Sequence, residues 1–125
     1  MMYDTDILIW IQRGNPKAAR MVEKDRQRSL SIQSYMELLQ GARDKAEQKV
    51  VKDFISAFDF QILPLSENIG HRALVYVEEY ALSAGMRSAD ALIAATAVER
   101  NLELVSSNTK HFKAVGELRL KAFRP

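Results

Sequence analysis

The sequence predicts an α/β fold, a three-layer α/β/α sandwich around a short and mostly parallel sheet of about five strands. Two observations predict it. Short apolar runs alternate along the chain with amphipathic segments, and the apolar residues of those segments recur at helical spacing. Strands separated by helices pair in parallel and are covered on both faces. The chain has 125 residues, a typical size for one domain, so we expect a single domain over residues 1–125.

The expected strands are brief apolar or alternating runs. In chain order they are residues 1–3, 29–32, 60–63, 102–105 and 118–122. Apolar and basic residues alternate in the last of them, which suits an edge strand. A further apolar run, Ile7–Ile11, fits a strand or a helix equally well.

The expected helices begin at residues that commonly cap helices. Asn15 is followed by a proline, which is tolerated at the first helical position. Ser34, Ser66 and Ser88 are the other expected caps, and the helix after Ser88 is apolar nearly all round, which indicates burial on several sides. The expected helical segments are 16–25, 34–42, 51–58, 66–84, 89–98 and 109–115.

The composition excludes several classes of site. There is no cysteine, which excludes disulfides, thiolate catalysis and cysteine-based zinc sites. Hydrophobic residues make up 47% of the chain and charged residues 27%, enough to build a core and a soluble surface. The formal net charge is only +2, so a nucleic-acid partner cannot be argued from charge alone.

The chain shows neither of the two common membrane signals. No apolar run approaches about 20 residues, the length that a transmembrane helix requires. The first residues also lack the basic segment followed by an apolar stretch that a signal peptide needs. We therefore expect a cytoplasmic protein with no membrane partner.

Several polar residues fall at one predicted edge of the sheet. Asp4 and Asp6 follow the first strand, Glu37 and Asp90 lie in the first turns of predicted helices, and Asn108 follows the fourth strand. Strand ends and the helix starts that follow them share an edge in such a sheet, where ligands gather. We expect these side chains to converge there.

Carboxylates that converge repel one another unless a cation lies between them. With no cysteine and no well-placed histidine, a hard and oxygen-liganded ion such as Mg²⁺ or Mn²⁺ suits the site best. Such an ion activates a water molecule and neutralises charge on a phosphate, which is the chemistry of phosphodiester hydrolysis. The pattern therefore predicts a metal-dependent nuclease.

Each acid also has a purely structural interpretation. Ser34 and Glu37 have the spacing of a capping box, in which the glutamate accepts a hydrogen bond from the serine backbone. Asp90 would be favoured by the helix dipole without any catalytic role, although its apolar surroundings call for a partner. The segment from Asp4 to Asp6 could form a turn at the end of the strand.

Four segments resemble motifs of the PIN-domain ribonucleases, in the order in which that family has them. They are Asp4–Ile9, Ser31–Leu38, Ser88–Ala97 and Ser106–Phe112. The resemblance covers essentially the whole chain, and its most specific segment is the one around Asp90. Within the family, the chain resembles the VapC-type toxins of toxin–antitoxin pairs.

The resemblance implies an endoribonuclease that depends on Mg²⁺ or Mn²⁺ and cleaves RNA. It also implies a homodimer, and a cognate antitoxin whose tail fills the active-site groove. Carried over by position, Asp4, Glu37 and Asp90 are the catalytic and metal-binding carboxylates. Thr5 matches the hydroxyl residue after the first acid, and Asp6 matches a position at which a supporting, non-ligating role is implied.

One departure from the family pattern concerns the number of metal ions. Many PIN domains have a fourth acid near the position of Asn108, where this chain has an amide. We therefore expect one permanently held ion, and any second ion to arrive with the RNA. Arg87 and Lys110 are candidates for contacting RNA phosphates. His111 is a further candidate for such a contact, and we do not expect it to be a metal ligand.

Two alternatives remain open at the level of the sequence. Asn108 keeps open a non-catalytic RNA-binding or interaction module with the same fold. A phosphatase of the haloacid-dehalogenase type would use Asp4 as nucleophile and Asp6 as general acid, but it requires threonine or valine where this chain has Leu8.

Overall fold

A computed structural model, which describes residues 1–125, contains five strands and seven helices. The strands are β1 (Met2–Tyr3), β2 (Ser29–Ser31), β3 (Gln61–Leu63), β4 (Leu104–Ser106) and β5 (Leu120–Ala122). The helices are α1 (Thr5–Gln12), α2 (Pro16–Lys24), α3 (Ile32–Gln40), α4 (Lys45–Ala57), α5 (Glu67–Ala84), α6 (Ser88–Glu99) and α7 (Thr109–Phe112).

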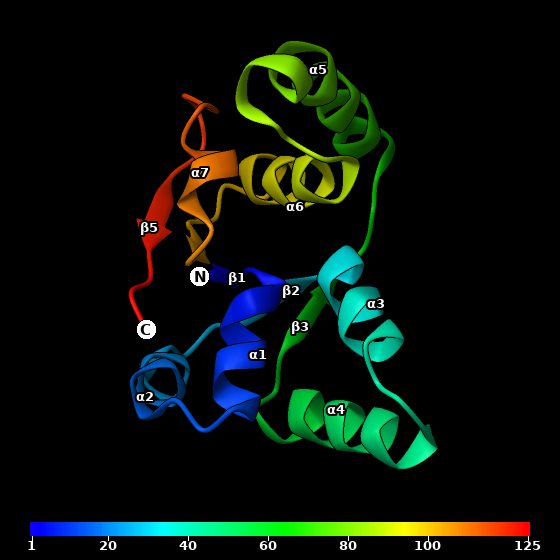
Figure 1. Ribbon diagram of the computed structural model, residues 1–125, viewed down its shortest axis with the longest axis vertical. Helices are drawn as coiled ribbons and strands as arrows, with labels where there is room; N and C mark the ends of the chain where they lie inside the picture. The colour runs from blue at the N-terminus through cyan, green and yellow to red at the C-terminus, as the bar shows by residue number, and fades with distance from the viewer.

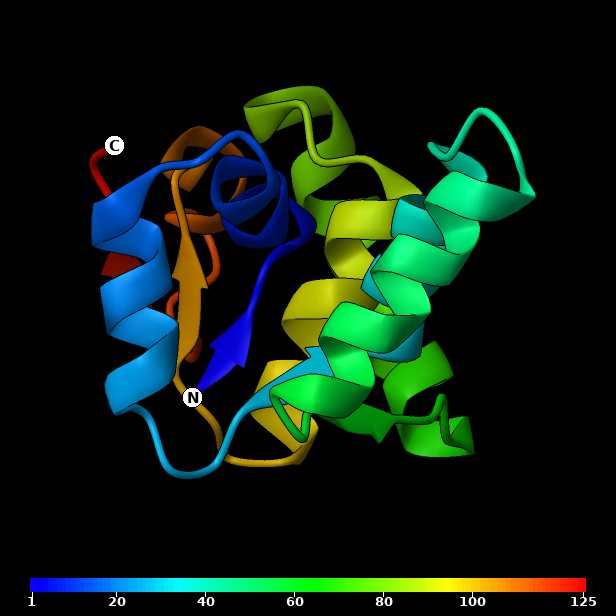
Figure 2. The same cartoon turned by 90° about the horizontal axis from the view of Figure 1, so that it is seen from below.

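The five strands form one sheet in the order β3-β2-β1-β4-β5, and every neighbouring pair is parallel. One layer of helices, α5 to α7, lies on one side of this sheet, and α1 to α4 lie on the other (Figure 1). Seen from below, α2 and α4 lie toward opposite ends of their layer (Figure 2). The predicted α/β/α sandwich is confirmed, and its sheet is wholly parallel.

Two hydrophobic cores occupy the two faces of the sheet. Side chains alternate along each strand, so Met2 and Leu104 face the core beneath α5 and α6, and Tyr3 and Val105 face the core with α1 to α4. Both strands are buried on both faces, as a covered parallel sheet requires. Helix α6 is also buried through most of its length, which its nearly continuous apolar sequence predicts.

The ambiguous run Ile7–Ile11 is helical and belongs to α1. Asp4 is the cap of that helix, with its side chain accepting from the Thr5 amide. Ser66 caps α5 as predicted, and Gly85 ends it in the left-handed conformation with φ of 69°.

Two predicted helix caps are wrong. Helix α3 begins at Ile32 and its cap is Ser31, whose hydroxyl accepts from the Gln33 amide. Ser34 lies within the first turn of that helix and is fully buried, because the helix begins immediately at the end of β2. Helix α6 likewise begins at Ser88 itself, and its cap is Arg87.

Arg28 joins the ends of two helices on the face of α1 to α4. Its guanidinium donates to the Val22 and Glu23 carbonyls at the end of α2, and to the Phe58 carbonyl at the end of α4. It also lies over the Phe58 ring, 5.5 Å from the centroid. A cation is favoured at helix C-termini, where unpaired carbonyls carry partial negative charge.

We expect Arg28→Ala to lower the free energy of unfolding by about 2–3 kcal/mol, because charged hydrogen bonds contribute more than neutral ones. Urea denaturation followed by circular dichroism measures this loss. Arg28→Lys should recover part of it, and the exposed neighbour Arg26→Ala should have little effect. Equal stability of wild type and Arg28→Ala would contradict this role.

None of the seven helices combines the length and the apolar character needed to cross a membrane.

Candidate functional site

The strand order places β1 beside β4 at the point where the chain changes faces. After β1 it enters α1 on one side of the sheet, and it reaches β4 from α6 on the other side (Figure 1). In parallel sheets, ligands bind outside the carboxyl ends of the strands at such a switch point. Asp4 directly follows β1, and Ser106 is the last residue of β4.

Asp4 is buried, with 7% of its surface exposed. One carboxylate oxygen accepts from the Thr5 amide at 2.8 Å, and the other accepts from the Ser106 hydroxyl at 2.7 Å. Burial is the main cause that raises the pKa of Asp4 to about 7, and the neighbouring Asp6 raises it further. The hydrogen bonds from Ser106 and Thr5 oppose this rise, and Asp90 adds a smaller upward contribution.

Asp6 is held by the same segment that follows β4. Its Oδ2 accepts from the Ser107 amide at 3.0 Å and also from the Ser107 hydroxyl. Its Oδ1 is buried and has no hydrogen-bond partner, and the same is true of the Thr5 hydroxyl beside it. Buried polar atoms without partners are uncommon. Here they lie next to a buried acid whose pKa is raised.

Asp90 lies in the first turn of α6, where it is partly buried. Its Oδ2 accepts from the Arg87 amide at 3.3 Å and lies 3.0 Å from Nδ1 of His111. The Asn108 amide nitrogen lies 3.4 Å from the same imidazole nitrogen, and the Asn108 side chain is exposed. Asp90 therefore has a local capping contact and also a contact from α7.

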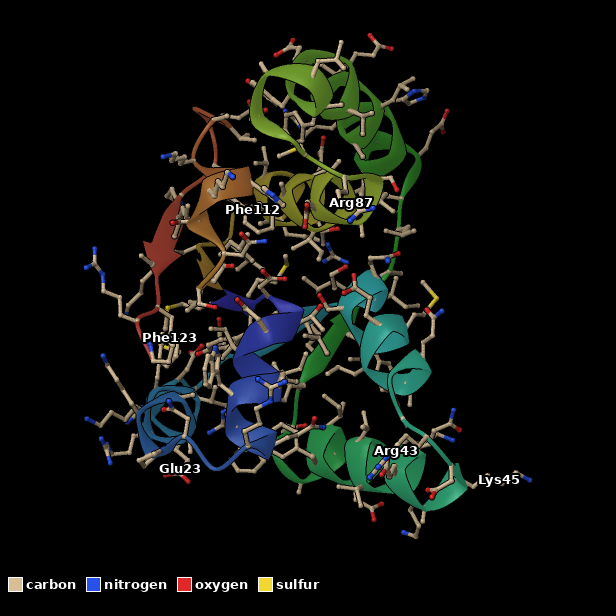
Figure 3. The ribbon with its side chains drawn as sticks, viewed as in Figure 1. Glu23, Arg43, Lys45, Arg87, Phe112 and Phe123 are labelled. Carbon is tan, nitrogen blue, oxygen red and sulfur yellow. The ribbon has the colours of Figure 1, made fainter.

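Glu37 shares no hydrogen-bond partner with Asp4, Asp6 or Asp90. It accepts from the Gln33 side chain at 3.3 Å and has no contact with the Ser34 backbone, so the capping-box interpretation is wrong. It lines a groove of about 660 Å³ between α1, α3 and α4. Arg43, labelled in Figure 3, and Glu47 of α4 also line it and form an ion pair with each other.

The two candidate cations, Arg87 and Lys110, are both exposed. Arg87 precedes α6, as Figure 3 shows, and Lys110 lies on α7. Neither forms a salt bridge with an acid of the site, so both are free to meet a negatively charged ligand.

The donor chemistry fits a hard divalent cation with a partial shell of protein ligands. No three histidine, aspartate or glutamate side chains converge at ligating distances, so there is no preformed cage. Mg²⁺ is ordinarily bound through one or two carboxylates and keeps several waters or substrate oxygens. Asp4, whose pKa Asp90 helps to raise, and Asp90 itself supply such carboxylate donors, and the unpartnered Asp6 oxygen lies in the same segment as Asp4. The three-acid set with Glu37 stays a prediction.

Three contacts of the site were not predicted from the sequence. The Ser106 and Ser107 hydroxyls hold Asp4 and Asp6, and His111 contacts Asp90. The sequence placed these residues after the fourth strand without showing that this strand pairs with the first. Assuming a Rossmann-like strand order, in which the fourth strand lies beside the first, would have predicted that these residues lie near the acids.

Comparison with solved structures finds close structural relatives. A toxin–antitoxin complex from Klebsiella pneumoniae contains a chain with 29% identity and a TM-score of 0.78, the alignment covering 94% of this chain and 93% of that one. VapBC2 from Rickettsia felis, bound to a DNA fragment from its promoter, gives 23% identity, a TM-score of 0.79 and 98% coverage of both chains. VapBC-1 from nontypeable Haemophilus influenzae gives 21% identity and a TM-score of 0.79, with the alignment covering 97% of this chain and 96% of that one. The last two similarities concern the fold alone.

A search among curated proteins by sequence finds no match. The sequence model of the family described as PIN domain matches residues 1–118, nearly the whole chain. This match agrees with the order of the four sequence motifs and with the wholly parallel sheet. PIN domains are generally nucleases, and this chain belongs to the PIN-domain family.

Proposed function

We propose that this PIN domain is a metal-dependent endoribonuclease and the toxin component of a type II toxin–antitoxin module. The observation that carries the proposal is the buried Asp4 at the sheet switch point, with Asp6 and Asp90 close enough to raise its pKa. A buried acid surrounded by other acids is unfavourable without a cation, and such perturbed groups concentrate at functional sites.

The roles in this proposal combine the structure with the family resemblance. Asp4 and Asp90 would hold the cation, and Asp6 would support it from the first turn of α1. Glu37, on α3, would complete the set of acids that the resemblance implies. A bound Mg²⁺ or Mn²⁺ supplies a nucleophilic water at neutral pH and neutralises charge on the scissile phosphate. Arg87 and Lys110 contact neighbouring phosphates, which orients the RNA without selecting its sequence.

The partners are part of the same proposal. The Klebsiella pneumoniae relative is a toxin–antitoxin complex, and the groove beside Glu37 offers an antitoxin a mixed apolar and charged surface. Helix α5 exposes large apolar side chains, among them Leu74 at 58% and Leu82 at 102%. Such a surface favours association, which agrees with the homodimer that the family resemblance implies.

Membership of the PIN family argues against the phosphatase alternative. Leu8, at the position where a haloacid-dehalogenase-type phosphatase needs threonine or valine, is buried in the core and supplies no group for chemistry. The non-catalytic module remains the competing function and is an outcome of the following experiment.

We expect the purified protein to cleave a mixed RNA pool in Mn²⁺ but not in EDTA, and we expect no cleavage by Asp4→Asn or Asp90→Asn. Product lengths are measured on a denaturing gel over a time course. Asp53→Asn, which changes an exposed carboxylate paired with Lys49 on α4, is the matched control and should cleave like wild type.

Two outcomes would contradict the proposal. Equal cleavage by wild type and Asp4→Asn would indicate a contaminant or a different site. No cleavage by any variant, in the presence of Mn²⁺ and with the antitoxin absent, would favour the non-catalytic module.

A further inference from the structure

His111 stands out among the groups that the proposed reaction does not use. Its Nδ1 lies 3.0 Å from Oδ2 of Asp90, across 21 residues of chain. Only 26% of the His111 side chain and 17% of the Asp90 side chain are exposed. The contact is therefore sheltered, and it joins α7 to the start of α6.

A carboxylate in its ionised form only accepts hydrogen bonds, so the contact is a hydrogen bond in the tautomer that carries the proton on Nδ1 of His111. In that tautomer the Asn108 amide nitrogen, 3.4 Å from Nδ1 and also a donor, makes no hydrogen bond to the ring. The Arg87 amide donates to the same oxygen of Asp90. Both donors thus engage Oδ2, and no protein group donates to Oδ1, which leaves that oxygen available to a ligand.

His111 belongs to a wider pattern in the segment 106–111. Ser106 donates to Asp4, Ser107 donates to Asp6, and His111 contacts Asp90. The acids themselves come from the starts of α1 and α6, on opposite faces of the sheet. One short segment, from the last residue of β4 to α7, therefore contacts all three of them.

The position of the His111 ring is itself well supported. Phe112, the next residue, is fully buried in the core under α5 and α6. Nε2 of His111 points toward the end of α5, where a Cβ placed on Gly85 would lie 4.0 Å from it. A ring that is mostly buried and precedes Phe112 in this way can orient the neighbouring carboxylate.

We infer that His111 is a positioning residue that orients the Asp90 carboxylate through Nδ1 and leaves Oδ1 available to hold a divalent cation. The inference rests on the proposed metal-dependent function. Groups that hydrogen-bond to metal ligands fix their orientation, and losing one typically weakens metal binding or activity by about 10- to 100-fold.

The test is a Mn²⁺ titration of the metal-free protein without RNA. Binding is measured by isothermal titration calorimetry and by the electron paramagnetic resonance signal of free Mn²⁺. We expect His111→Ala to weaken Mn²⁺ binding by about tenfold or more. His111→Asn should bind within about threefold of wild type, because its amide nitrogen occupies the position of Nδ1. His111→Gln, whose amide nitrogen corresponds to Nε2, should bind as weakly as His111→Ala.

His71→Ala is the matched control, since His71 is an exposed histidine on α5 whose side chain is 72% exposed. It should bind like wild type. Far-ultraviolet circular dichroism of every variant checks that the fold is kept.

The outcomes separate this inference from the proposed function. The positioning role is overturned if His111→Ala binds Mn²⁺ with wild-type affinity, or if His111→Asn and His111→Ala lose affinity equally. The proposed function then stays intact, provided that Asp90→Asn weakens Mn²⁺ binding. Absence of Mn²⁺ binding by wild type, or unchanged binding by Asp4→Asn and Asp90→Asn, overturns the proposed metal dependence and the inference with it.

Discussion

Asp4→Asn is expected to stabilise the metal-free protein at pH 8 even though it removes the carboxylate on which the proposed activity depends. The pKa of Asp4 is raised from 3.8 to about 7, chiefly by burial and then by Asp6. Between these two values the folded protein retains a proton that the unfolded chain has released. The free energy of unfolding therefore falls as the pH rises through this range, and above pH 7 the penalty is fully developed.

The size of the penalty follows from the shift. Each pKa unit corresponds to about 1.4 kcal/mol, so the rise from 3.8 to about 7 means that the ionised and buried Asp4 costs on the order of 4 kcal/mol at pH 8. Asparagine avoids this cost and keeps the local geometry. Its oxygen can accept from the Thr5 amide, and its NH₂ group can donate to the Ser106 hydroxyl, which also accepts.

Urea denaturation in EDTA at pH 4, 6 and 8 measures the effect. The stability difference between Asp4→Asn and wild type should be near zero at pH 4 and should increase to a few kcal/mol at pH 8. Added Mn²⁺ should stabilise wild type but not Asp4→Asn, because ligands that bind only the folded state raise its stability. A difference that does not change with pH would contradict the raised pKa, and Asp53→Asn is the control for removing a carboxylate.

The fold was predictable because its signals are local or follow from general rules of connection. Apolar runs separated by amphipathic segments indicate parallel strands, and the caps Asn15 and Ser66 lie where the sequence places them. The same rules bring Asp4 and Asp90 to one edge, because strand ends and helix starts share it. Their electrostatic coupling in the structure agrees with that expectation.

The errors came from competition between equivalent local signals. Ser31 and Ser34 are both good caps, and the sequence does not show which one is used. The choice depends on where β2 stops pairing with its neighbours, which is a tertiary property. Because Ser31 is the cap, Glu37 lies in the second turn of α3 and cannot be the glutamate of a capping box.

The contacts that complete the site could not be predicted from the sequence, for a related reason. The pairing of β1 with β4 joins segments about a hundred residues apart, and it alone brings Ser106 to Asp4. The polarity of Ser106 and Ser107 gives no sign of their partners. His111 appeared isolated because histidine ligands are recognised by sequence spacing, whereas its contact with Asp90 is made through space.

Phe112→Ala is expected to lower the free energy of unfolding by about 3–5 kcal/mol, the usual range for removing a buried aromatic ring. Phe112 is fully buried against the core that contains Met2 and Leu104. It is the last residue of α7, a helix of four residues that is too short to be stable without tertiary contacts. Its ring therefore anchors the segment that contacts the acids.

Chemical denaturation measures this loss, and Phe112→Leu, which keeps most of the apolar volume, should lose much less. Because Phe112→Leu should remain folded, it also allows a Mn²⁺ titration, in which binding should weaken modestly if the anchor determines the position of His111. A loss below about 1 kcal/mol in Phe112→Ala would show that α7 is held by other contacts. Asp4→Asn and Phe112→Leu thus separate two ways of weakening metal binding. The first removes a proposed ligand and raises the stability of the metal-free protein at pH 8, whereas the second keeps every proposed ligand and loosens the segment that contacts them.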